Sequence, residues 1–332
     1  MEERERLQAM VTGYRLSATI AVAADLGLAD ELADGPRSTA ELAAAVSADP
    51  DSLHRLLRAL AAVGVFAEED GRFALTPLGQ GLRSDAPGSL RPLARTLTDP
   101  ALWAAWGHVG HSVRTGENAF EALHGVDVWT HREREPEQNA IFNATMASLS
   151  SRFAGPVAAA YDFAGLSSVV DVGGGVGVLL EAVLARNEHL TGTVFDRPHA
   201  VGSGPPSGAE LVGSRWTAEE GDFFAEVPAA DCYLLKWILH DWPDDECGQI
   251  LRVCRQGLNP GGVVLVVERV LGRSGHEVDV AFADLNMMVL PGGRERSEEE
   301  YAALFATADL QLRRVVHTDG PLSILEAVAA PE

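Results

Sequence analysis

The sequence predicts an α/β fold built on a seven-stranded, mostly parallel sheet, preceded by an N-terminal domain that is helical and of winged-helix type. From about residue 165, short apolar and β-branched runs alternate with helical patterns, as in a parallel sheet covered by helices on both faces. Before residue 100 the expected order is helix, helix, helix and hairpin. This is the order of a winged helix.

The composition limits the class of partner. The 332 residues, 46% of them hydrophobic, are enough for two cores of ordinary domain size. The formal net charge of −22 disfavours nucleic acids and anionic membranes, because both are polyanions. The charged start is followed by no signal-type apolar core, and no apolar run approaches the roughly 20 residues of a membrane span. We therefore expect a cytoplasmic protein with a small neutral or cationic ligand.

The N-terminal domain is expected over residues 1–100. Ser38 and Glu41 have the spacing of a capping box, Asp49 opens the next helix, and residues 65–75 read as a hairpin. A winged helix often binds DNA, but this stretch contains ten arginines against fifteen acidic residues. Because affinity for DNA depends largely on phosphate contacts, we expect its apolar helices to pack against a domain or a second subunit instead.

Residues 101–160 are expected to form a helical connector, and residues 161–332 to carry the sheet. The seven strands are expected at residues 168–172, 192–196, 215–219, 231–236, 262–268, 311–316 and 322–328.

A glycine-rich turn follows the first of these strands. The glycines at 173, 175 and 177 satisfy a G-x-G-x-G spacing, whereas a dinucleotide fingerprint would need glycine at Val178. Glycines here let a ligand lie against the main chain, beside the N–H groups that open a helix. The turn indicates a nucleotide-like cofactor, with close packing of strand and helix as the alternative explanation.

Polar residues follow the next strands, where open α/β sheets bind ligands. Asp196 stands about 20 residues after the glycines and could accept both hydroxyls of a ribose. Asp222 could accept a hydrogen bond from an adenine amino group, and Phe223 could pack against the adenine ring. Lys236 is the only lysine in the chain, which suggests a specific role.

His240 lies just past the fourth strand and could act as a general base, since imidazole is free to accept a proton near neutral pH. Glu268 ends a wholly apolar strand and could hold the imidazole tautomer, and Glu295 is a second acid that could flank the ring. Asp284 and Asn286, polar residues on an apolar helix, are expected in a pocket.

Four acids follow His240 and raise the possibility of a divalent metal. They are Asp241, Asp244, Asp245 and Glu246. Because they surround the start of the helix expected at 246–258, where acids complement the helix dipole, we favour a structural role and expect no metal site.

The whole chain resembles the S-adenosylmethionine (SAM)-dependent small-molecule O-methyltransferases of the plant caffeate type and their bacterial polyketide-tailoring relatives. The matching segments are residues 75–79, 142–146, 171–177, 195–199, 221–224, 236–242, 292–297 and 323–327. Asn286 stands where plant members often carry an apolar contact, so their phenylpropanoid substrates are not implied.

The resemblance implies a Rossmann-like SAM-binding catalytic domain, a homodimer built by the N-terminal domain, and a small aromatic substrate. The residues implied to hold SAM are Gly173, Gly175, Asp196, Asp222, Phe223 and Lys236. His240 is implied as the base, with Glu268 and Glu295 beside it. The acceptor pocket is expected to involve Trp103, Phe142, Met146, Asp284, Asn286 and Leu290.

Two other functions remain open at this point. Some members of the family bind SAM but have diverged to hydroxylation or decarboxylation of polyketides. A ligand-responsive DNA-binding regulator is disfavoured by the acidic N-terminal domain.

Overall fold

The structure is a computed structural model that describes residues 3–201, 206 and 212–331. The chain divides into two compact units, Met1–Trp103 with Glu135–Ser148, and Ala104–Arg134 with Leu149–Glu332. Compactness does not define functional domains, so the boundaries expected near residues 100 and 160 stay predictions.

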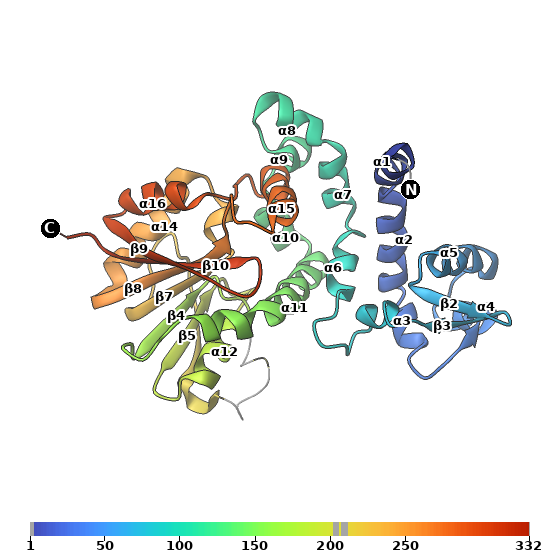
Figure 1. Ribbon diagram of the computed structural model, residues 1–332, viewed down its shortest axis with the longest axis horizontal. Helices are drawn as coiled ribbons and strands as arrows, with labels where there is room; N and C mark the ends of the chain where they lie inside the picture. The colour runs from blue at the N-terminus through green and yellow to red at the C-terminus, as the bar shows by residue number, and fades with distance from the viewer. Residues whose placement is uncertain (1–2, 202–205, 207–211, 332) are drawn as a thin grey trace. The chain divides into compact units, whose positions relative to one another are not determined.

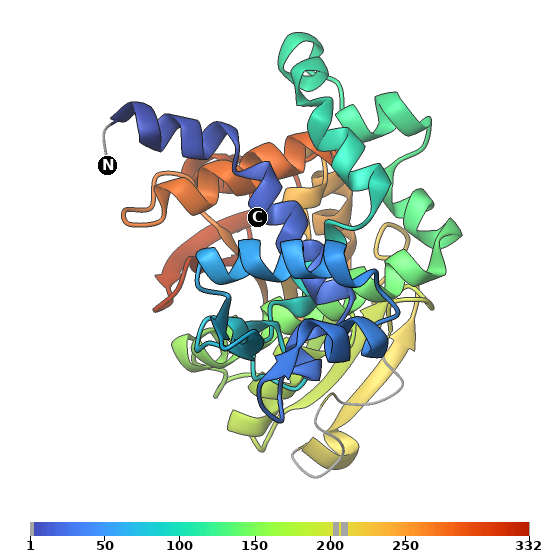
Figure 2. The same cartoon turned by 90° about the vertical axis from the view of Figure 1, so that its right-hand side faces the viewer.

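The first unit begins with the helical part and small sheet of the predicted winged helix (Figure 2, blue). Its helices here are α1 (Glu3–Val11), α2 (Tyr14–Asp25), α3 (Leu28–Glu31), α4 (Thr39–Ala45) and α5 (Pro50–Ala62). Its strands are β1 (Arg37–Ser38), β2 (Phe66–Glu69) and β3 (Arg72–Leu75), in the order β1-β3-β2. The two-residue strand β1 is an addition to the predicted hairpin.

Local capping explains where two of these helices begin. Ser38 caps α4, and Glu41 closes the capping box by accepting the N–H of Ser38 at 2.7 Å. Asp49 caps α5 by accepting the N–H of Ser52 at 2.9 Å. Both predicted helix starts are therefore confirmed, because they depend only on neighbouring residues.

Short helices connect this region to the large sheet. They are η1 (Gly79–Leu82), α6 (Arg91–Thr96), α7 (Pro100–Gly107), α8 (Val109–Thr115), α9 (Ala119–His124), α10 (Val128–Arg134) and the long α11 (Pro136–Ala160).

The second unit contains a seven-stranded sheet in the order β6-β5-β4-β7-β8-β10-β9 (Figure 1). The strands are β4 (Ser168–Val172), β5 (Thr191–Asp196), β6 (Trp216–Glu220), β7 (Ala230–Lys236), β8 (Leu258–Arg269), β9 (Leu310–His317) and β10 (Leu322–Ala329). Only β10 pairs antiparallel, with β8 and with β9. The predicted seven-stranded, mostly parallel sheet is confirmed.

The helices of this unit are α12 (Val178–Arg186), α14 (Asp244–Gly257), α15 (Glu277–Val289) and α16 (Glu298–Ala306), with short turns η2 (Gly213–Arg215) and η3 (Leu239–Asp241). The β4–α12–β5 and β7–α14–β8 connections step in opposite directions along the sheet. Because such crossovers are right-handed, α12 and α14 cover opposite faces. The carboxyl ends of β4 and β7 therefore border a topological switch point, where ligands bind in open α/β sheets.

Within the described residues, none of the helices is long and apolar enough to cross a membrane.

Candidate active site

The three glycines of the turn after β4 have positive φ angles, 67° at Gly173, 58° at Gly175 and 81° at Gly177. A Cβ at Gly173 would overlap the Ile238 side chain, and one at Gly177 would lie 2.6 Å from Val194 Cγ2. At Gly175 a Cβ would meet no atom of the described residues within 4 Å. The outer glycines are therefore required for packing, and the open space at Gly175 is where a ligand can approach the main chain.

Asp196 lies beside this turn. The N–H of Gly175 donates to its Oδ2 at 2.9 Å, and the N–H of Arg197 donates to its Oδ1 at 2.7 Å. Burial raises the pKa of Asp196, and the two N–H groups act in the opposite direction. The structure thus brings together two of the residues that the sequence assigns to SAM, Gly175 and Asp196.

Two groups of opposite charge type lie near the carboxyl ends of the central strands β4 and β7, with Asp171 buried and Lys236 partly buried. Asp171, at 2% exposure, has its pKa raised to about 7 by burial, an effect that the charge of Lys236 opposes. Burial lowers the pKa of Lys236 to about 8, against the attraction of Asp171. The Lys236 Nζ lies 4.0 Å from the centre of the Trp237 ring. Asp171 is a charged neighbour of Lys236 that the sequence analysis did not assign to the site.

Phe223 and Asp222 follow β6. The Phe223 ring lies against the glycine turn, since a Cβ at Gly173 would be 3.7 Å from its Cε1. Its ring centre is 6.4 Å from that of Trp242. Asp222 is exposed, and its Oδ1 accepts the N–H of Phe224 at 2.9 Å. Phe223 is therefore placed beside the glycine turn, and Asp222 is exposed.

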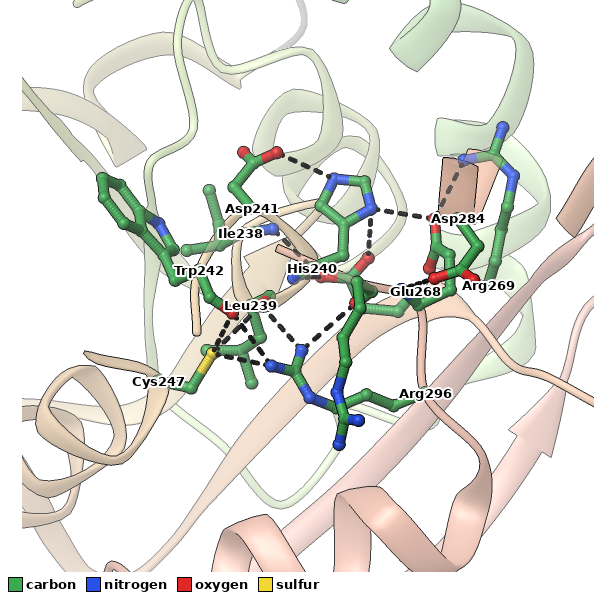
Figure 3. A network of polar contacts seen from close by, with 12 residues as sticks. Ile238, Leu239, His240, Asp241, Trp242, Cys247, Glu268, Arg269, Asp284 and Arg296 are labelled. Carbon is green, nitrogen blue, oxygen red and sulfur yellow. Dashed lines mark hydrogen bonds and ion pairs between the residues drawn. The ribbon is translucent and has the colours of Figure 1, made fainter. Parts of the chain in front are cut away.

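His240 is the centre of a polar network at the carboxyl edge of the sheet (Figure 3). Its Nδ1 lies 3.0 Å from Glu295 Oε1 and 3.5 Å from Glu268 Oε2. Its Nε2 faces Asp241 Oδ1 at 3.5 Å. His240 is 6% exposed and the two glutamates at most 1%. The three residues expected to form the catalytic group are thus brought together from three separate segments.

Each glutamate also has a second attachment. Glu268 Oε1 accepts the N–H of Ile238 at 3.0 Å and that of His240 at 3.4 Å. The N–H of Glu295 donates to Asp284 Oδ1 at 2.9 Å. Glu268 therefore orients the backbone that carries His240, while Asp284 orients the loop that carries Glu295.

The protonation of His240 differs from the expectation of a free imidazole at neutral pH. Burial alone lowers its pKa, but the carboxylates of Glu268, Asp241 and Glu295 outweigh burial and raise the pKa to about 9. In the protein as described, His240 is therefore a cation at pH 7. The sequence predicts His240 as the base but not its charge, because the charge depends on carboxylates that only the fold assembles.

Asp241 corrects another expectation. Asp244, Asp245 and Glu246 do occupy the first turn of α14, as expected, but Asp241 belongs to η3 and not to the helix start. Burial raises the pKa of Asp241 to about 6, an effect that the charge of His240 opposes. Asp241 is therefore a member of the site that the sequence analysis missed.

Among the residues that the structure describes, one group could hold a metal ion. It consists of His240, Glu268 and Glu295, whose ligand atoms lie within 4.8 Å of one another. Hydrogen bonds and ion pairs link the three residues directly, while Glu268 Oε2 and Glu295 Oε2 are buried without a hydrogen-bond partner among the described residues.

The residues expected in the acceptor pocket fall in both units. In the second unit, Asn286 accepts from Trp106 Nε1 at 3.3 Å, and the carbonyl of Leu290 accepts from Asn118 at 2.7 Å. Trp103, on α7, and the α11 residues Phe142 and Met146 belong to the first unit. Their part in a pocket stays a prediction.

Comparison with known proteins agrees with this fold. An O-methyltransferase domain model matches residues 106–311, and an O-methyltransferase dimerisation domain model matches residues 9–85. Phenazine O-methyltransferase PhzM of Lysobacter antibioticus is 41% identical, over 96% of this chain and 94% of the relative.

Two solved structures are also similar. LaPhzM has a TM-score of 0.93 at 40% identity, covering 99% of this chain and all of that one. NcsB1 from neocarzinostatin biosynthesis, solved with SAM and 2-hydroxy-5-methyl naphthoic acid, has a TM-score of 0.79 at 37% identity, covering 95% and 96% of the two chains.

The fold and the family models define a SAM-dependent methyltransferase with an N-terminal dimerisation domain. The chain belongs to the O-methyltransferase family, and the resemblance inferred from its motifs is confirmed. SAM is its cofactor, as expected.

Replacing Gly293 should disturb the His240 turn, because a Cβ there would overlap the His240 carbonyl oxygen and lie 2.7 Å from Trp242 N. We expect Gly293→Ala to lower the free energy of unfolding by about 1–3 kcal/mol, measured by urea unfolding. Gly165→Ala is the control, since a Cβ at Gly165 meets no described atom within 4 Å. Equal stability of the two variants would contradict the packing described here.

Proposed function

We propose that this enzyme transfers the methyl group of SAM to a phenolic or enolic hydroxyl of a small aromatic or polyketide-type compound, with His240 as the general base. The observation that carries the proposal is the arrangement of His240. One ring nitrogen, Nδ1, is held by Glu295 at 3.0 Å, and the other, Nε2, lies 3.5 Å from Asp241 Oδ1, so we assign Nε2 as the nitrogen that takes the acceptor proton.

The proposed reaction is an in-line displacement at the methyl carbon. When bound, SAM supplies an electrophilic methyl group on a sulfonium that leaves as a neutral thioether. The acceptor O–H bond breaks as its proton passes to His240 Nε2, and the oxygen forms the new bond to carbon. Glu295 and Glu268 stabilise the imidazolium that results, at 3.0 and 3.5 Å from Nδ1.

The proposed cofactor cradle is formed by the chain's own residues. Gly175 leaves space at the main chain, Asp196 lies beside it, and Phe223 packs against the same turn. The proposed cradle also includes Lys236, which lies over the Trp237 ring, and the exposed Asp222. Alignment of the reacting atoms can contribute roughly 7–11 kcal/mol to lowering the barrier in ideal cases, so the cradle matters as much as the base.

The acceptor class and the assembly are supported by the relatives. One similar protein is named as a phenazine O-methyltransferase and another was solved with a naphthoic acid, and both compounds are aromatic. The dimerisation domain model over residues 9–85 supports a homodimer built by the N-terminal domain. A cytoplasmic location remains a prediction.

A mass-spectrometric screen tests this proposal. The protein is incubated with SAM and a panel of hydroxylated naphthoic acids, phenazines and simple phenols. A product heavier by the mass of one methylene group, with release of S-adenosylhomocysteine, is expected for at least one compound. A product that has gained one oxygen atom or lost carbon dioxide would instead indicate the hydroxylation or decarboxylation alternative.

Removing the base should separate chemistry from binding. We expect His240→Gln to lower turnover by about 10²- to 10⁴-fold, the usual contribution of a general base. The Kd for S-adenosylhomocysteine, measured by calorimetry, should change little. His189→Gln is the control, since His189 contacts the Phe163 carbonyl at 3.2 Å. Unchanged turnover in His240→Gln would remove His240 from the mechanism.

The pH dependence of turnover should follow the charge of His240. Because only the neutral imidazole accepts a proton and its pKa is raised to about 9, turnover should rise with pH through that value. Glu295→Gln removes a carboxylate that raises this pKa, so its rising limb should move to lower pH. The wild-type enzyme and Glu295→Gln are assayed with the same acceptor, so that ionisation of the acceptor affects both pH profiles equally. A limb that moves to higher pH in the variant would contradict this assignment.

A further inference from the structure

The buried guanidinium of Arg296 lies against the turn that carries His240 (Figure 3). Its side chain is 1% exposed, and Arg296 is the largest by volume of the fully buried residues in the described part of the chain. A buried cation is costly unless its donors are paired. The acceptors within reach are Asp244 Oδ1, the carbonyl oxygens of Leu239, Trp242 and Arg294, and Cys247 Sγ.

Two of these acceptors bracket His240. Nη1 donates to the carbonyl of Leu239 and Nη2 to that of Trp242, each at 2.9 Å. The N–H groups of Ile238 and His240 are bound by Glu268. The turn is thus held by a guanidinium at its carbonyl groups and by a carboxylate at its N–H groups.

Glu295, which directly precedes Arg296, also contacts His240. Glu295 binds the His240 ring at Nδ1, and Arg296 binds the backbone on either side of the same histidine. One dipeptide therefore contacts both the ring and the backbone of the turn. Gly293 keeps this loop close, because a Cβ there would overlap the His240 carbonyl oxygen.

We propose that Arg296 is a positioning residue for methyl transfer, which holds the turn from Leu239 to Trp242 so that the His240 ring meets Glu295 at hydrogen-bond distance. The inference rests on the proposed role of His240 as the base. Arg296 acts through the turn and does not itself contact the substrate or the cofactor.

The contacts favour this role over a purely stabilising one. Asp244 is the carboxylate that Arg296 contacts, and its side chain is 59% exposed, so the ion pair is partly screened by solvent. Buried ion pairs are often replaced by apolar side chains without loss of stability. The geometric requirement is more specific, because two planar donor groups must reach two carbonyls three residues apart.

Several other charges act on His240 and must stay unchanged in a test. Glu268, Asp241 and Glu295 raise its pKa directly. Lys236 and Arg132 act on Asp241. Arg269 Nη1 lies 4.0 Å from Glu295 Oε1. Arg296→Lys keeps the positive charge and removes the planar fork, so it isolates geometry from charge.

The test measures the pKa of His240 by NMR in the full-length protein, with the resonance assigned through His240→Gln. We expect Arg296→Lys to lower this pKa by about one unit, a tenfold change, because the bond to Glu295 lengthens. The Kd for S-adenosylhomocysteine should stay within about threefold, and turnover should fall about tenfold or more. Arg294→Lys is the matched control, since Arg294 contacts the same Asp244 at 3.2 Å but is 47% exposed.

Asp244→Asn provides a second variant that leaves the guanidinium in place. It should lower the pKa of His240 in the same direction by a smaller amount, because the guanidinium loses one of its anchors. A His240 pKa that is unchanged in both variants overturns the proposal. Loss of the native circular dichroism spectrum or of S-adenosylhomocysteine binding in Arg296→Lys also overturns it, since the role would then be structural.

The NMR comparison separates this inference from the proposed function. If the wild-type protein methylates no compound of the panel, the proposed reaction fails, but the pKa comparison still shows whether Arg296 sets the geometry of His240.

Discussion

The buried carboxylate of Glu268 is the constraint on which the site depends. Glu268 is the penultimate residue of β8, is 0% exposed, and accepts hydrogen bonds from the N–H groups of Ile238 and His240. An unpaired carboxylate in this position would be strongly destabilising, so the turn after β7 must supply donors. The backbone of this turn is also in an unusual conformation, since Trp237 has a φ angle of 58°, which is rare for a bulky residue. This contact joins two neighbouring strands and determines where His240 can lie.

Charges of both signs are concentrated around this contact in a medium of low dielectric constant. Burial disfavours the charged forms of Asp171, Glu268 and Lys236, whose pKa values move to about 7, 7 and 8. His240 moves in the opposite direction, because three carboxylates surround it. The pKa values of these four groups therefore lie between about 7 and 9. Perturbed pKa values of this kind cluster at functional sites, in agreement with the membership of the chain in an enzyme family.

Much of the fold could be predicted because its signals are local. The capping residues Ser38 and Asp49 act within one turn of helix, and the strands follow from short apolar runs between polar turns. His240 and Glu268 could also be predicted, because they lie at the carboxyl ends of β7 and β8, at one edge of the sheet. Asp241 and Arg296 could not be assigned in this way. Asp241 looks like a helix-start acid in the sequence, and Arg296 acts through backbone carbonyls that leave no pattern in the chain.

The order of elements, the glycine turn, the residues near the strand ends and the family resemblance could all be inferred from the sequence. These depend on spacing along the chain. The folded structure shows in addition that Gly175 faces open space while Gly173 and Gly177 are packed. It also shows that the carboxylates around His240 raise the pKa of its imidazole to about 9. The physical reason is that packing space and electrostatic energy depend on atoms brought together from distant segments, and such distances are not encoded in the neighbours of any one residue.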